Sequence, residues 1–260
     1  MNEDLDANLY PPPWIDMKAE SYIFMTYTRS IDRIPDSWSD PFRSTLTSSP
    51  QNRRYIGGIG TIMIIRYFEA PCGPYDELMF CPGKFTVPAL QNKSKFGITR
   101  IYVSTEASVQ SGRANWGIPK QLAKFRFYKS RDCLSQLSDH VEVSSVNGNN
   151  PFFSMRLQKK LTFISLPVNT AYIPLDLELV HPPLTIADGV QITEKSISVN
   201  PCIRGWFSFV AGEGNLKDGK WGDGNSFPDI CPISVGFYSS AMVVSFPVGK
   251  KYTVKQSKTA

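Results

Sequence analysis

The sequence has few of the residues from which metal centres and thiol-based active sites are built. It contains only two histidines, His140 and His181, and its five cysteines form no CxxC pair. Zinc sites need clustered Cys and His ligands, and a cysteine nucleophile needs a histidine partner. We therefore expect no metal site, and we interpret the cysteines as reduced, mostly buried thiols.

The chain also lacks long apolar runs and long runs of one charge. No apolar stretch reaches the roughly 20 residues that cross a bilayer. Lys and Arg number 28 against 23 Asp and Glu, a net charge of +5 that is scattered along the chain. This pattern argues against a membrane protein and a nucleic-acid-binding face, whereas a mild positive charge helps to attract a carboxylate substrate. The segment Met1–Pro13 is acidic and broken by proline, so we expect no targeting peptide and a cytoplasmic protein.

Proline, glycine and aromatic residues are abundant, which favours short strands and turns over long helices. The 260 residues include 20 prolines and 18 glycines, and 42% are hydrophobic, as in a globular protein. We predict an N-terminal arm over residues 1–20 and a single, mainly β domain over 21–260, with antiparallel strands closing around a pocket. The predicted strands cover 20–28, 55–69, 75–80, 98–103, 124–128, 139–145, 151–157, 161–166, 189–199, 202–211 and 232–247.

A glycine-rich motif, Gly57-Gly58-x-Gly60, lies at the start of the apolar strand predicted over 55–69. A phosphate-binding loop has its glycines after a strand and before a helix, so this context argues against a nucleotide site. Glycine here is more typical of a bend or a close backbone approach.

The most informative stretch runs over residues 97–125. After the strand, Thr105 is suited to cap a short helix, and Gly112 to end it in a left-handed conformation. Pro119 disfavours helical angles at Ile118, so we predict a rigid extended turn before Lys120.

Lys120 has Trp116, Ile118 and Leu122 close by in sequence. Burial among apolar groups favours the uncharged amine of a lysine, and a free amine is the nucleophile of Schiff-base chemistry. A solvated surface lysine is the alternative interpretation of the same residue.

A glutamate with similar potential lies in the strand predicted from Tyr75. Strand alternation puts Tyr75, Glu77 and Met79 on one face. A carboxyl group among such neighbours is suited to burial and to proton exchange near neutral pH.

Two ordered motifs resemble the acetoacetate decarboxylase family over about residues 55–130. Gly112-Arg113 followed by Pro119-Lys120-x-Leu122, with Tyr102 and Glu106 before them, resembles the family's segment around its Schiff-base lysine. Residues 73–78, Gly-Pro-Tyr-Asp-Glu-Leu, resemble the segment that bears an active-site glutamate. The resemblance implies a cone-shaped antiparallel β-barrel, a homo-oligomer, and an imine-forming lyase acting on a small keto acid or other carbonyl compound.

The resemblance also implies roles for individual residues. Lys120 would form the imine and act as the electron sink, so that no cofactor is needed; Glu77 would shuttle protons, and Gln121 would hydrogen-bond the substrate or water. A bidentate arginine, Arg113 or Arg29, would orient a carboxylate, with a structural role for Arg113 and a surface position for Arg29 as alternatives. The further substrate-binding residues are Trp116, Ile118 and Tyr75.

One departure from the family pattern changes the expected chemistry. Family decarboxylases have a second lysine directly after the nucleophile, where this sequence has Gln121; the family is itself the standard case of a lysine activated beside another cation. Three hypotheses therefore stay open: a decarboxylase of β-keto acids, an aldolase- or dehydratase-type enzyme of secondary metabolism, and a non-catalytic pocket for a hydrophobic carbonyl compound.

Overall fold

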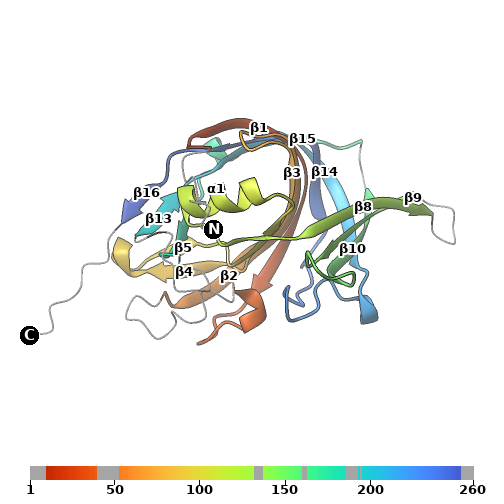
Figure 1. Cartoon of the computed structure of the whole chain (residues 1–260), viewed down its shortest axis with the longest axis horizontal. Helices are drawn as coiled ribbons and strands as arrows, with labels where there is room; N and C mark the ends of the chain where they lie inside the picture. Colours follow the sequence, from red (N-terminus) through yellow and green to blue (C-terminus); the bar gives the residue numbers. More distant parts are fainter. Residues whose placement is uncertain are drawn as a thin grey trace, which may run out of the picture.

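The computed structural model describes residues 10–39, 53–131, 137–159, 163–184, 193 and 195–252 (Figure 1). Strands dominate this part of the chain, and its helices are α1 (Glu106–Trp116) and the short 3-10 turns η1 (Asp36–Trp38), η3 (Pro88–Leu90), η4 (Thr170–Tyr172) and η5 (Lys217–Gly219). None of these helices is long and apolar enough to cross a membrane. The mainly β prediction is confirmed.

Within the described residues, sixteen strands belong to one sheet. They are β1 (Trp14–Thr28), β2 (Tyr55–Glu69), β3 (Tyr75–Cys81), β4 (Lys84–Val87), β5 (Lys93–Phe96), β6 (Arg100–Val103), β7 (Lys120–Leu122), β8 (Lys124–Arg131), β9 (Leu137–Ser144), β10 (Pro151–Lys159), β11 (Leu166–Asn169), β12 (Leu179–His181), β13 (Ser196–Val199), β14 (Cys202–Gly214), β15 (Gly236–Phe246) and β16 (Lys250–Tyr252).

The hydrogen-bonded order of this sheet runs β16-β13-β12-β5-β4-β2-β1-β15-β14-β10-β9-β8. The two ends of this path do not pair within the described residues, so the expected closure into a cone-shaped barrel is not confirmed. The sheet also branches, because β2 pairs through its first residues with β4 and through Thr61–Tyr67 with β3. The branch β3-β6-β7 carries the strands of the candidate site.

The glycine motif of β2 lies where the sheet branches. A Cβ on Gly60 would lie 2.6 Å from the Pro82 carbonyl carbon, closer than side chains tolerate. Gly57 has a positive φ of 83°, which favours glycine. The predicted bend and close backbone approach are therefore confirmed.

The first strand begins earlier than the sequence pattern suggested. Residues 14–20, expected in an arm, belong to β1 and pair with β2 and β15. Asp16 has a positive φ of 55° within a register shift, and such a bulge hides the alternation that marks a strand. Trp14 is buried and donates its indole N–H to the Tyr10 carbonyl.

Most of the later strands agree with the predictions in position but not always in length. β14 and β15 match the strands predicted over 202–211 and 232–247. The strand predicted over 161–166 is wrong for residues 163–165, which are turn and coil, because β11 begins only at Leu166. The strand predicted over 189–199 is observed in its last four residues as β13. Residues 160–162, 185–192 and 194 lie outside the described part. Short strands bounded by proline leave their ends poorly marked in sequence.

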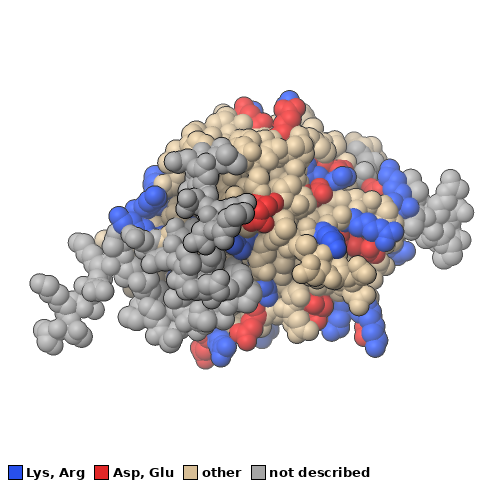
Figure 2. Space-filling model, in the orientation of Figure 1, with Lys and Arg blue, Asp and Glu red and all other residues tan. Residues whose placement is uncertain are grey.

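The charged side chains on the face seen in Figure 2 lie interspersed, basic beside acidic. Cross-strand ion pairs also place basic beside acidic side chains within the sheet, among them Arg126–Glu142 at 3.5 Å and Lys129–Asp139 at 3.9 Å on β8 and β9. Exposed pairs of this kind contribute little stability. The pattern agrees with the scattered charge of the sequence.

Two hydrophobic cores lie on opposite faces of β2 and β3, as strand alternation dictates. Ile62 and Ile64 of β2 belong to one core, with Leu78 of β3. Met63 and Ile65 belong to the other core, which also contains Trp116 of α1. Figure 1 shows α1 within the curve of the sheet, on the side of this second core.

Candidate active site

The β2–β3 hairpin places two functional side chains on one face. Tyr75 and Glu77 alternate along β3 with residues that face the other side of the sheet, and they pair with Tyr67 and Ile65 of β2, respectively. All four side chains are buried, so the face is part of the core instead of a solvated edge.

The unit β6–α1–β7 brings Lys120 to the same face. β6 and β7 are parallel neighbours, and parallel strands need a crossover such as α1 between them. Lys120 lies opposite Ile101 of β6, which in turn pairs with Met79 of β3. The sheet therefore carries Lys120 and Glu77, 43 residues apart in sequence, into contact.

The helix begins as predicted but ends differently. The Thr105 side chain accepts a hydrogen bond from the Ser108 N–H and caps the helix. The left-handed residue that ends it is Gly117, with φ 62°, and not Gly112. Gly112 and Gly117 are both suited to end a helix, so the sequence alone does not decide between them. The prediction that the helix ends at Gly112 was wrong.

Gly112 lies inside the helix, where it makes room for the Lys120 side chain. A Cβ built on it would lie 2.6 Å from Cδ and 2.8 Å from Cε of Lys120. Carbon atoms pack at about 3.5–4.0 Å, so only a glycine leaves space for the lysine side chain to cross the helix. Next to it, Arg113 Nε donates a 2.8 Å hydrogen bond to the Lys120 carbonyl and holds the backbone of the lysine.

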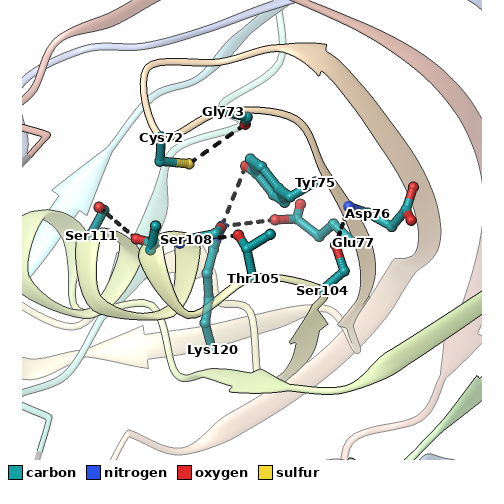
Figure 3. A network of polar contacts seen from close by, with 11 residues as sticks. Cys72, Gly73, Tyr75, Asp76, Glu77, Ser104, Thr105, Ser108, Ser111 and Lys120 are labelled. Atoms are coloured by element: carbon teal, nitrogen blue, oxygen red, sulfur yellow. Dashed lines mark hydrogen bonds and ion pairs between the residues drawn. The ribbon is translucent and has the colours of Figure 1, made fainter.

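The Lys120 amine ends in a polar cluster (Figure 3). Nζ lies 2.9 Å from Glu77 Oε2, 3.0 Å from Ser108 Oγ and 3.5 Å from the Tyr75 hydroxyl. Lys120 and Glu77 are each only 5% exposed. A buried charge needs such a partner, and removal of either one would leave the other charge uncompensated.

Two tyrosines complete the buried end of the site. The rings of Tyr67 and Tyr75 stack with centroids 4.5 Å apart. Burial raises the pKa of both hydroxyls well above 10, and the Glu77 charge adds to this effect. Both therefore stay neutral phenols at physiological pH and can donate hydrogen bonds to a bound group.

Cys72 lies beside this cluster in Figure 3. Burial raises the pKa of its thiol, although the nearby Lys120 charge acts in the opposite direction. A thiol that keeps its proton is a poor nucleophile, so Cys72 is better suited to shaping the site than to chemistry.

The polar cluster opens into a cavity of about 210 Å³. Most of its lining is apolar, from Trp14 on β1 to Phe246 on β15. Among the described lining residues, the charged ones are Glu77 and Lys120. The arrangement can hold an apolar molecule with one polar group directed at the lysine.

The structure brings five of the predicted site residues together and leaves three apart. Lys120, Glu77, Tyr75, Trp116 and Ile118 all line the cavity. Gln121 follows Lys120 on β7 and so points to the opposite face, where its cross-strand partner Tyr102 belongs to the other core. Any side chain at position 121 thus lies across the sheet from the amine.

Neither predicted arginine lines the cavity. Arg29 is exposed beyond the end of β1, as the surface alternative foresaw. The Arg113 side chain is bound to the Lys120 backbone, which agrees with the structural alternative for that residue. Within the described ranges, no three or more His, Cys, Asp and Glu side chains lie close enough together to bind a metal ion.

Sequence reasoning missed Ser108 and Tyr67. Ser108 lies in α1 and is fully buried against Lys120; nothing in the sequence distinguishes it from other helix-surface serines. Tyr67 carries a usable signal, because an antiparallel pairing of β2 and β3 through residues 71–74 puts it opposite Tyr75.

Comparison with known proteins identifies the fold. No protein-family model and no curated protein matches the sequence. Among solved structures, acetoacetate decarboxylase from Legionella pneumophila matches with a TM-score of 0.61 and 14% identity, covering 94% of this chain and 88% of that one. A second acetoacetate decarboxylase structure matches with a TM-score of 0.57 and 12% identity, covering 95% and 93%. The chain has the acetoacetate decarboxylase fold, and the resemblance seen in its sequence is confirmed at that level.

Proposed function

We propose that this protein is an imine-forming lyase that acts on a β-keto acid or a related carbonyl compound through Lys120. The observation that carries the proposal is the buried Lys120 amine, 2.9 Å from the Glu77 carboxylate in the lining of an apolar cavity. A lysine that serves only as a surface charge has no need of such burial.

The chemistry begins with a proton transfer. Glu77 takes a proton from the Lys120 ammonium, and the free amine attacks the substrate carbonyl carbon. A carbon–nitrogen bond forms, and the carbonyl oxygen leaves as water after Glu77 returns its proton to it. Ser108 and Tyr75 lie within 3.5 Å of Nζ and are placed to hydrogen-bond the departing oxygen.

The resulting iminium accepts the electron pair of a neighbouring carbon–carbon bond. In a β-keto acid this bond joins the α-carbon to the carboxylate, which leaves as carbon dioxide. The enamine then takes a proton that Glu77 relays from water, and a water molecule hydrolyses the iminium and releases the ketone and the Lys120 ammonium. The lysine supplies the electron sink by itself.

An aldol-type reaction is the second candidate, and the cavity lining favours it. Among the described lining residues, none is an arginine that would pair with a substrate carboxylate. In this reaction the same enamine forms or breaks a bond to a second carbonyl carbon. Carbon dioxide release distinguishes the two reactions.

Borohydride trapping tests the proposal. The protein is incubated with a panel of β-keto acids, α-keto acids and neutral ketones, reduced, and analysed by intact mass and peptide mapping. We expect a substrate-dependent mass gain on Lys120 that is absent in Lys120→Ala. The exposed lysine variant Lys124→Ala is the matched control and should trap like the unchanged protein. No adduct with any compound would leave the third hypothesis, a binding protein that keeps its ammonium paired with Glu77.

A further inference from the structure

The wall of the cavity that β2 and β3 form, here called the cavity floor, leads away from Lys120 and so limits the shape of the substrate. Three cross-strand pairs of β2 and β3 face the cavity in succession: Ile65–Glu77, Met63–Met79 and Thr61–Cys81. Strands rise about 3.3 Å per residue, so the four residues from Glu77 to Cys81 span about 13 Å. The floor is therefore long compared with the polar cluster at its start.

Exposure increases along the β2 side of this floor, whereas Cys81, at the far end of the β3 side, is 5% exposed. Tyr67 and Tyr75, next to Lys120, are 3% and 5% exposed. Met63 is 7% exposed, Thr61 is half-buried, and Ile59, which lines the cavity beyond Thr61, is 55% exposed. The amine thus lies at the closed end and solvent at the other end, so a substrate has to enter with its carbonyl first.

The surroundings of the entering molecule are apolar from the second pair onward. Met63 and Met79 have flexible, polarisable side chains that adapt to an alkyl chain. Glu77 and Lys120, the charged residues of the described lining, already neutralise each other at the closed end. A charged group held between the methionines would lose its hydration without gaining a partner.

We propose that the substrate is a carbonyl compound whose carbonyl stands near one end of an unbranched apolar chain of roughly eight to ten carbon atoms. The size follows from the volume, since an apolar cavity of about 150 Å³ holds benzene and this one measures about 210 Å³. The chain lies along the methionines, with its far end at Ile59. This inference names the substrate class of the proposed function and rests on it for the position of the carbonyl.

A chain-length series tests the inference. Dissociation constants of methyl ketones with about four to twelve carbons are measured by calorimetry for the unchanged protein and for Lys120→Met/Glu77→Gln. Each buried methylene should tighten binding about fourfold, and the gain should stop once the chain passes the Thr61–Cys81 pair. The double variant cannot form an imine, and it leaves no unpaired charge that would endanger the fold.

A steric variant locates the chain. Met79→Trp fills the middle of the floor and should weaken binding of the long ketones at least tenfold, while the shortest ketone is unaffected. Phe68→Trp is the matched control, because Phe68 is 50% exposed on β2 and lies outside the cavity lining. It should bind every ketone like the unchanged protein.

The outcomes separate this inference from the proposed function. A chain-length dependence in the double variant, together with no trapping on Lys120, would refute the imine chemistry and keep the apolar substrate. Trapping on Lys120 with no chain-length dependence, or with tightest binding of short keto acids, would overturn the inference.

Discussion

Substitution of Gly112 by alanine tests whether the helix positions the lysine. The new Cβ would lie 2.6 Å from Lys120 Cδ, whereas carbon atoms pack at about 3.5–4.0 Å. The lysine side chain must therefore move by about 1 Å, which carries Nζ away from Glu77 and Ser108. A displacement of this size lowers the rate of a positioned reaction by about a hundredfold.

Stability should change far less than reactivity in Gly112→Ala. Alanine favours a helix interior over glycine by about 1 kcal/mol, and overpacking costs about 1–3 kcal/mol. The net loss should therefore stay within about 2 kcal/mol, measured by urea unfolding. The matched control is Gln110→Ala, a change in the same helix at a position away from the lysine.

The assay compares the initial rate of borohydride-dependent mass gain on Lys120 in the three proteins. We expect a loss of about a hundredfold for Gly112→Ala and no change for Gln110→Ala. A Gly112→Ala protein that is folded and traps substrate at the unchanged rate would refute the positioning argument.

Three further predictions concern the surroundings of the amine. Glu77→Gln should lower the free energy of unfolding by about 3–5 kcal/mol, because it leaves the buried Lys120 charge without a partner. The double variant Lys120→Met/Glu77→Gln should recover most of this loss. Equal losses in the single and the double variant, measured by urea unfolding, would contradict the prediction. Burial raises the pKa of Tyr67 and Tyr75 well above 10. The unfolded chain therefore loses these protons first, and the free energy of unfolding falls as the pH rises above about 10. Tyr67→Phe should make this fall smaller between urea titrations at about pH 8 and pH 11, and an unchanged fall would contradict the prediction. Arg113→Gln should lose one hydrogen bond to the lysine backbone, which costs about 1 kcal/mol of stability. It should also slow borohydride trapping on Lys120 about tenfold. Equal trapping rates in this variant and the unchanged protein would exclude a positioning role for Arg113.

Much of the sheet around the site was predictable from local patterns. β2 has the predicted bounds, and β3 extends the predicted strand by one residue, because their side chains alternate clearly and turn residues bound them. The same alternation placed Glu77 and Tyr75 on one face. Thr105 as a helix cap also follows from the strong preference of a single residue, whereas the helix end at Gly117 was wrongly placed at Gly112.

Other features depend on contacts between segments that no local pattern contains. Ser108 and Lys120 meet because α1 packs across the strand that follows it, and Gly112 is needed only because the lysine side chain crosses there. The bulge at Asp16 hid the first part of β1, and the placement of Arg29 outside the cavity depends on where that strand ends.

The sequence by itself thus determined the mainly β class and the two hairpin strands, because periodicity is a local property. Its resemblance to a known family marked the lysine and the glutamate as a pair worth testing. Only the tertiary structure decided that the pair is buried at 2.9 Å, that residue 121 faces away from it, and that an apolar cavity extends from it toward Ile59. Burial and distance arise from the packing of strands far apart in the chain, and they determine whether the amine can act as a nucleophile.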